Sequence, residues 1–528
     1  MILILAANAC CVFALWKLAS SDAGASAAPP GDAASAPPVA ELHSGPPRRP
    51  DVVNARDARL EARVEGRVRA ALEKAARETK GRVQPSEVTV AVHVRELAVP
   101  GELVALHADR SLRPASNLKL VTTAAALALL GPEWEFRTPF VSDAPIVEGR
   151  LAGDLVVRAS GDPLYDPEAR GEVAELLAPA LDALVAAGVR GIDGALVLDE
   201  GDFQAPEPGP AWPTEKEWWK EYCALAGGFS ANAGCLTANV LAGEGTNARV
   251  DVRPRGHAFP ERLGVRTVGA KQALDVRVGA LNGTVVVEGS IPRDVPEWSA
   301  RFAVADPVDL FGRVLLHAFQ ARCIAVRGGL VRARRPTTPR ERELASLRSP
   351  LARVLVPINT DSNNACADQL FLALGHALAG RGTRAGGRAA TASALERLGI
   401  DPASLVQVDG SGLSRENRVT ARQITALVDA VLCGHPAAAE LYLDSLAVGH
   451  ETGTLDGRMK DQRLAGRVRA KTGFINGTSA LSGILDAEDG RTLVFSILVE
   501  YPPEGGLNQT CWKPMQDQIC AELVRADG

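Results

Sequence analysis

Residues 114–130, PASNLKLVTTAAALALL, are the most informative stretch of this 528-residue sequence. Pro114 predicts the start of an apolar helix, and Gly131-Pro132 predicts its end. Lys119 lies within this apolar run, three residues after Ser116, so the two side chains are expected on one helix face. Burial lowers the pKa of a lysine, and a neutral amine beside a hydroxyl is a base next to a nucleophile. The stretch therefore predicts an acylating serine near a helix N-terminus, against the alternative of an ordinary helix start.

A second pattern, Lys471-Thr472-Gly473, precedes a strand predicted over 478–485. Lysine and threonine offer a cation and a hydroxyl to a carboxylate, and glycine allows a ligand backbone to approach closely. The alternative is a surface strand start. A third pattern, Ser362-Asn363-Asn364, lies between a helical segment at 351–359 and a helix predicted over 365–380. S-x-N also occurs at 230–232, so order and context decide its meaning.

S-x-x-K, S-x-N and K-T-G in this order form the pattern of penicillin-recognising serine enzymes. With its flanking sequence, the chain resembles the D-Ala-D-Ala carboxypeptidase/endopeptidase family, the class C low-molecular-mass penicillin-binding proteins that include penicillin-binding protein 4. The resemblance runs from about residue 58 to the C-terminus, and the 246-residue gap between Ser116 and Ser362 fits a family that carries extra domains there. The flanking segments are GDP at 161–163, DGSGLSR at 409–415 and GTL at 453–455.

The resemblance implies that Ser116 attacks the carbonyl of the penultimate D-Ala while Lys119 takes its proton. Ser362 would relay a proton to the leaving amine, and Asn364 would hold Lys119 and the substrate amide. Lys471 would also help keep Lys119 neutral.

In the same resemblance, Lys471 and Thr472 bind the substrate carboxylate, beside Gly473. The backbone N–H groups of Ser116 and Phe474 form the oxyanion hole. Peptidoglycan stem peptides are the implied substrates and β-lactams the implied inhibitors, with no metal or organic cofactor.

One residue departs from the family pattern. The family usually continues K-T-G with threonine, but this chain has Phe474, which keeps a backbone N–H and loses a hydroxyl. A milder change places Asp368 where the family often has glutamate. Two alternatives stay open: a β-lactamase or esterase on the same fold, and a non-catalytic cell-wall binding protein.

The resemblance implies an α+β, penicillin-binding/β-lactamase-like transpeptidase fold, an antiparallel sheet with helices on both faces, interrupted by β-rich inserted domains. We expect a signal peptide or membrane anchor at 1–20, where the sequence is apolar, and a Pro/Ala-rich disordered tether at 21–55. The catalytic domain would comprise 56–143 and 346–528. Residues 144–345 would form the inserted domains, two in number.

Composition limits the remaining options. The formal net charge is −5, so the composition lacks the excess of basic residues that would indicate nucleic acid as a partner. Signal and tether together predict a periplasmic or extracytoplasmic protein, with membrane anchorage open. Only 10 lysines stand against 48 arginines, so two at the proposed site are notable.

Three minor expectations complete the sequence reading. Cys223/Cys235 and Cys511/Cys520 are equally compatible with local disulfides and free thiols. Arg458 is expected in solvent. Trp212 is expected in a core or an interface.

Overall fold

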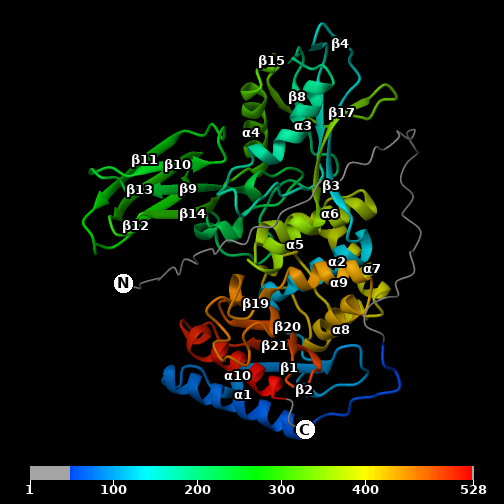
Figure 1. Ribbon diagram of the computed structural model, residues 1–528, viewed down its shortest axis with the longest axis vertical. Helices are drawn as coiled ribbons and strands as arrows, with labels where there is room; N and C mark the ends of the chain where they lie inside the picture. The colour runs from blue at the N-terminus through cyan, green and yellow to red at the C-terminus, as the bar shows by residue number, and fades with distance from the viewer. Residues whose placement is uncertain (1–47, 282, 526–528) are drawn as a thin grey trace.

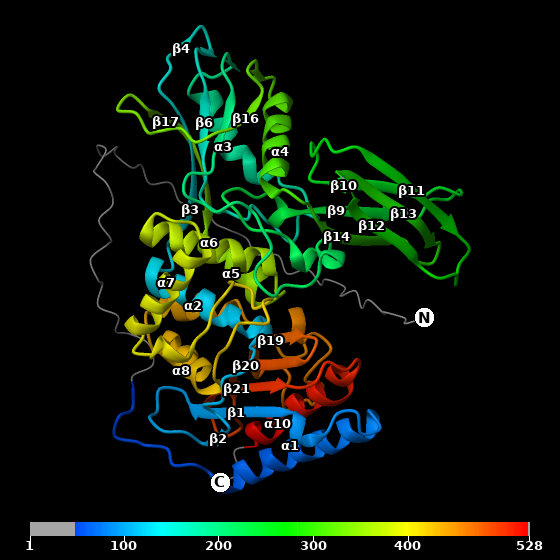
Figure 2. The ribbon, with the colours of Figure 1, turned by 180° about the vertical axis from the view of Figure 1, so that it is seen from behind.

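The computed structural model describes residues 48–281 and 283–525. The predicted signal or anchor segment and most of the predicted tether therefore lie outside the described residues. Within the described ranges, no helix is both long and apolar enough to cross a membrane. The N-terminal and C-terminal parts of the described residues build one body, and the middle of the chain forms the region above and beside it (Figures 1 and 2).

The body contains a six-stranded antiparallel sheet in the order β18-β19-β20-β21-β1-β2. The first strands of the described residues thus pair with the last ones, so segments far apart in sequence share one sheet. The strands are β1 (Thr89–Glu96), β2 (Val104–Leu106), β18 (Ala447–Val448), β19 (Val468–Ile475), β20 (Thr478–Asp486) and β21 (Thr492–Glu500).

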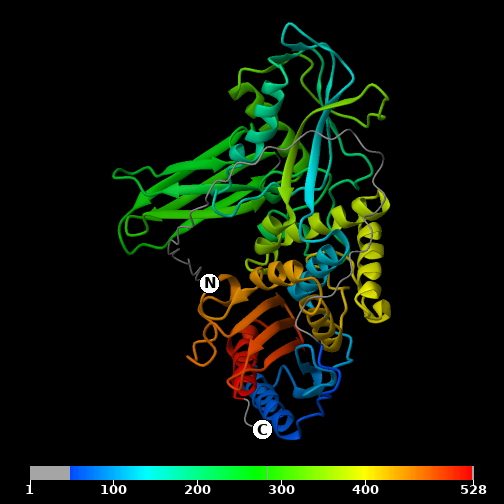
Figure 3. The ribbon, with the colours of Figure 1, turned by 45° about the vertical axis from the view of Figure 1, so that its right-hand side comes forward.

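Helices cover both faces of this sheet, as the resemblance implied (Figure 3). Residues of β21 alternate between two cores: Val494 and Leu498 pack on the helical layer, whereas Phe495 and Ile497 pack against α1 (Ala58–Glu78) and α10 (Lys513–Val524). A strand buried on both faces is largely apolar, which explains the run TLVFSILV, where Ser496 is the buried polar exception.

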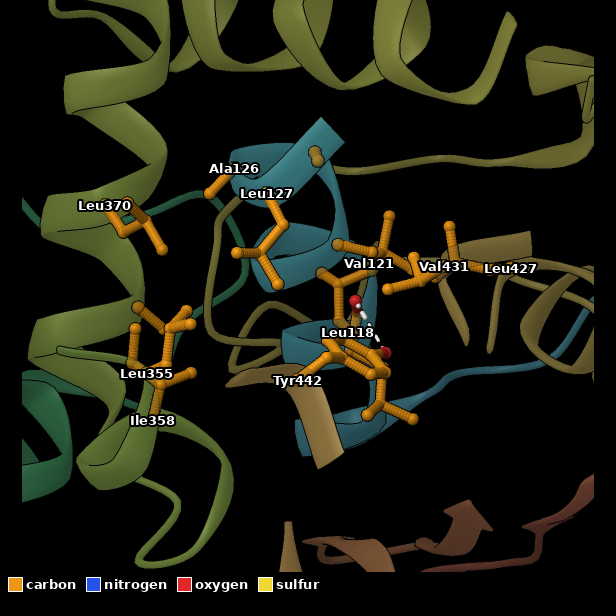
Figure 4. Packing of buried hydrophobic residues seen from close by; sticks show 14 of the residues in the cluster. Leu118, Val121, Ala126, Leu127, Leu355, Ile358, Leu370, Leu427, Val431 and Tyr442 are labelled. Atoms are coloured by element: carbon orange, nitrogen blue, oxygen red, sulfur yellow. Dashed lines mark hydrogen bonds between the residues drawn. The ribbon is translucent and has the colours of Figure 1, made fainter. Parts of the chain in front are cut away.

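The helical layer surrounds α2 (Leu118–Leu130), which is buried from Leu118 to Leu127. Figure 4 shows leucines of α2 facing side chains from several neighbouring helices. The Tyr442 hydroxyl donates to the carbonyl of Leu120 at 3.1 Å. The surrounding helices are α5 (Leu351–Asn359), α6 (Asn364–Ala379), α7 (Arg384–Arg397), α8 (Ala421–Leu432) and α9 (Pro436–Asp444).

The inserted region leaves and rejoins the body through the antiparallel pair β3 (Glu135–Ser142) and β17 (Arg342–Pro350). These strands end the five-stranded sheet β16-β8-β6-β3-β17, with β6 (Leu155–Arg158), β8 (Leu196–Asp199) and β16 (Leu330–Arg332). A small sheet combines β4 (Ile146–Val147), β5 (Arg150–Leu151), β7 (Gly191–Ile192) and β15 (Ala325–Val326). Helices α3 (Ala174–Ala186) and α4 (Pro307–Ala321) pack nearby.

A second lobe projects sideways from this region (Figure 1). It holds two three-stranded sheets: β10-β9-β14, formed by Arg249–Arg253, Cys235–Leu241 and Glu297–Ala303, and β11-β13-β12, formed by Glu261–Val268, Thr284–Pro292 and Asp275–Leu281. The predicted boundary at 345/346 falls inside β17. We therefore propose that the inserted region begins and ends at the body side of the β3–β17 pair, near residues 134 and 351.

Candidate active site

The start of α2 brings Ser116 to a cavity. A short 3₁₀ turn, Ala115–Asn117, carries Ser116 directly into the helix. Ala115 has a φ of 46°, a conformation that non-glycine residues rarely adopt. Gly412 packs against this turn so closely that a Cβ there would lie 1.9 Å from the carbonyl oxygen of Ala115. The surrounding structure therefore holds the strained turn in place.

Lys119 is fully buried one turn further along α2. Its Nζ lies 3.0 Å from Ser116 Oγ, 2.6 Å from Asn364 Oδ1 and 2.7 Å from the carbonyl oxygen of Ser411. Burial lowers the pKa of Lys119, and the nearby carboxyl of Asp368 opposes this shift. The structure thus brings together a hydroxyl and an amine whose charged form is disfavoured by burial.

The Ser362–Asn364 motif lies at the start of α6 and faces the same cavity. Ser362 has a φ of 66° and is half-buried. Asn363 caps the helix, because its side-chain oxygen accepts from the N–H of Cys366 at 3.0 Å. The other S-x-N match lies in the inserted region, where Asn232 Nδ2 donates to the carbonyl of Cys235.

Lys471, Thr472 and Gly473 lie within β19, whereas the sequence placed them only before a strand. Lys471 is fully buried, and burial together with the proximity of Lys119 sets its pKa well below the ordinary value. A Cβ at Gly473 would lie 2.8 Å from the carbonyl oxygen of Pro114, so glycine lets β19 meet the start of α2. The Asn117 side chain joins the two elements: in the amide orientation that satisfies both of its ends, Nδ2 donates to the Lys471 carbonyl at 2.9 Å and Oδ1 accepts from the Ser482 hydroxyl.

A cavity of about 610 Å³ connects these elements. β18 pairs only with residues 469 and 470 of β19, so among the named strands none covers β19 from Lys471 to Ile475 on that edge. Phe474 is 54% exposed. The cavity is lined by Ser116, Trp212, Pro213, Thr214, Glu217, Tyr222, Ser362, Asn364, Gly412, Leu413, Arg415, Phe474, Ile475 and Asn476. Thr472 and Gly473 line an adjoining hollow of about 280 Å³, which Phe474 also borders.

Asp368 fixes the loop that supplies one acceptor to Lys119. It lies one helical turn after Asn364, and its Oδ1 accepts from the N–H groups of Gly410 and Ser411 at 2.7 and 2.9 Å. The carbonyl of Ser411 is thereby aimed at Lys119. Burial raises the pKa of Asp368, and the neighbouring carboxyl of Asp409 raises it further.

Sequence reasoning missed two contributors from the inserted region. Trp212 lines the cavity and donates its Nε1–H to Asp409 Oδ2 at 2.8 Å, and the carbonyl of Tyr222 accepts from Asn364 Nδ2 at 2.8 Å. The cluster of tryptophans at 212–219 was the available signal. The expectation that Arg458 is solvated is wrong: it is 8% exposed and forms an ion pair with Asp517 of α10.

The cysteines of the described chain are free thiols, which decides between the two alternatives for both local pairs. Cys223, Cys235, Cys511 and Cys520 are all buried.

Comparison with known proteins places this chain in a family. The model of the D-Ala-D-Ala carboxypeptidase 3 (S13) family matches residues 69–519. A D-alanyl-D-alanine carboxypeptidase of Actinomadura sp. strain R39 is 33% identical over 459 residues, covering 83% of this chain and 81% of the relative. The D-alanyl-D-alanine carboxypeptidase DacB of Haemophilus influenzae is 27% identical over 397 residues, covering 72% and 79%. The chain belongs to the S13 family of D-Ala-D-Ala carboxypeptidases.

A solved structure shares this fold. Penicillin-binding protein 4 (dacB) of Haemophilus influenzae matches with a TM-score of 0.69 at 22% identity, over 86% of this chain and 99% of that one. The same protein has been solved in complex with a β-lactam. The expected penicillin-binding fold with an interrupting insertion is confirmed.

Proposed function

We propose that this protein is a serine-type D-Ala-D-Ala carboxypeptidase that hydrolyses peptidoglycan stem peptides through an acyl-enzyme on Ser116. The observation that carries the proposal is the set of three oxygens around Lys119 Nζ. Family membership supplies the reaction class, and this geometry supplies the assignment of roles.

The contacts of Lys119 orient its lone pair. The amide oxygen of Asn364 and the backbone carbonyl oxygen of Ser411 can only accept hydrogen bonds, so they bind the two N–H groups of a neutral amine. The lone pair then faces Ser116, whose hydroxyl can donate. This arrangement is that of a general base beside a nucleophile.

Two buried lysines near each other disfavour a second positive charge. Lys119 contributes to the low pKa of Lys471, and each amine therefore favours the neutral form of the other when it is itself charged. Asp361 opposes the shift at Lys471. An entering substrate carboxylate would favour the protonated form of Lys471, and a charged Lys471 would in turn favour the neutral form of Lys119 as the base.

In the acylation step, Oγ of Ser116 forms a bond to the carbonyl carbon of the penultimate D-Ala as its proton passes to Lys119. The N–H groups of Ser116 and Phe474 would stabilise the oxyanion. When the tetrahedral intermediate collapses, the peptide bond breaks, and the proton held by Lys119 passes through Ser362 to the leaving amine. Water then hydrolyses the ester and restores the hydroxyl of Ser116.

The leaving-group side of the site has fewer hydroxyls than the family pattern. Thr472 would contact the terminal carboxylate with Lys471, and Phe474 offers an apolar ring where the family usually has a hydroxyl. That ring is exposed, so it leaves this side of the site open to solvent. Endopeptidase cleavage of cross-linked peptides is therefore part of the proposal.

β-Lactams would acylate the same serine, and peptidoglycan as substrate places the protein outside the cytoplasm. The N-terminal signal or anchor that the sequence predicts would deliver it there.

The test is release of D-Ala from a stem peptide ending in D-Ala-D-Ala, measured for wild type and Ser116→Ala. Wild-type release with none from the variant is expected. Nitrocefin turnover faster than D-Ala release would favour the β-lactamase alternative. Sacculus binding that persists in Ser116→Ala, with no turnover by wild type, would favour the non-catalytic one.

A further inference from the structure

Beside the cavity, four residues of the inserted region hydrogen-bond to catalytic elements of the body. We call these residues, Pro210, Ala211, Trp212 and Tyr222, the clamp. Its two ends contact two different catalytic elements of the body. One end meets the loop at 409–415, and the other meets Asn364 at the start of α6.

The Tyr222 end of the clamp sets the orientation of the Asn364 amide. Asn364 Nδ2 donates to the backbone carbonyl of Tyr222 at 2.8 Å, which leaves Oδ1 to accept from Lys119. A rotated amide would present an N–H to the Lys119 amine instead. The Tyr222 carbonyl is held in turn because the adjoining segment pairs with β14, where Ala303 N–H donates to the Trp219 carbonyl at 2.8 Å.

The Trp212 end of the clamp holds the loop whose Ser411 carbonyl accepts from Lys119. Trp212 Nε1 donates to Asp409 Oδ2, a carboxyl that is 1% exposed. The same carboxyl accepts from the N–H groups of Gly412 and Ser414.

Ser414 links this loop to the clamp a second time. Its hydroxyl donates to the Pro210 carbonyl at 2.7 Å. Because Asp409 is buried, a lost donor would leave a carboxyl partly unsatisfied and loosen the turn.

We propose, resting on the proposed function, that the clamp is a positioning element for the general base: it fixes from the inserted region both carbonyl-type oxygens that direct the Lys119 lone pair at Ser116. Within the clamp, Trp212 is the positioning residue that a substitution can test, because its hydrogen bond to Asp409 comes from the side chain. The inserted region is thereby part of the catalytic apparatus rather than only an appended binding surface.

The test compares Trp212→Phe with Trp218→Phe in the full chain. Trp218 offers a matched control, because its Nε1 also donates a 2.8 Å bond, but to the Pro213 carbonyl and at the surface. Stopped-flow labelling with a fluorescent penicillin separates the dissociation constant of the non-covalent complex from the acylation rate constant. We expect the rate constant to fall at least tenfold in Trp212→Phe, with the dissociation constant within threefold, and both within twofold of wild type in Trp218→Phe.

A second variant, Ser414→Ala, removes the other link between clamp and loop and should lower the same rate constant. A raised dissociation constant with an unchanged rate constant would overturn the proposal, because Trp212 would then only contact ligand. A smaller labelled fraction that reacts at the wild-type rate would also overturn it, since it reports folding alone. If wild type itself is not acylated, the proposed function fails first, which the wild-type trace shows directly.

Discussion

Replacing Lys119 by methionine tests the assignment of the general base. Methionine has similar length and fits a fully buried position, so the change removes the amine with little loss of packing. A positioned general base contributes about 10²–10⁴-fold in rate. Acylation of Ser116 should therefore slow by that factor, equivalent to about 3–5 kcal/mol in the barrier.

The same replacement has opposing effects on stability. It leaves Asn364 Oδ1 and the Ser411 carbonyl without the Lys119 donor, at about 1–3 kcal/mol each. Against this, the protein no longer buries an amine whose charged form is disfavoured. The two contributions are of similar size, so we expect the variant to fold.

The assay is the acylation rate constant for a fluorescent penicillin, with thermal unfolding measured in parallel. Lys74→Met is the control, since Lys74 lies on the outer surface of α1. A folded Lys119→Met protein that is acylated within tenfold of the wild-type rate would refute the general-base assignment.

Three further predictions concern residues around Ser116 and Lys119. Gly473→Ala forces β19 away from the start of α2 and should slow acylation by about 10²-fold without unfolding the protein, as stopped-flow labelling and thermal unfolding would show. Phe474→Thr restores a hydroxyl beside the carboxylate, and a bond to a charged group should raise kcat/KM for D-Ala release by about tenfold; an unchanged value would show that this position does not bind the carboxylate. Asp368→Asn removes the nearby negative charge that raises the pKa of Lys119, so the base stays neutral to lower pH and the acid limb of the acylation profile should move down by about one pH unit; an upward shift would contradict the sign.

Local geometry explains why the Ser116–Lys119 contact could be anticipated. Positions i and i+3 of a helix meet whatever the rest of the fold does, and the structure places the two side chains 3.0 Å apart. β19 was harder to recognise. Its sequence VRAKTGFI places a buried lysine and a glycine where a strand usually carries apolar side chains, because it serves the cavity rather than the core.

Contacts between distant segments could not be read from the chain. Trp212 and Asp409 lie 197 positions apart, and Tyr222 and Asn364 lie 142 apart, so both contacts depend on how the inserted region docks. Arg458 was misjudged for the same reason, since its partner Asp517 comes from the last helix. The arginine-rich composition predicted a solvated side chain, and only the fold shows that Arg458 has a carboxylate partner.

The most direct test of the account is the site of penicillin acylation. Benzylpenicillin opens its ring on the attacking oxygen and expels nothing, so the intact mass should rise by the mass of the whole antibiotic. Peptide mapping should place the adduct on Ser116, and Ser116→Ala should gain no mass. A folded wild-type protein that gains no mass, or an adduct on another residue, would contradict the central claim.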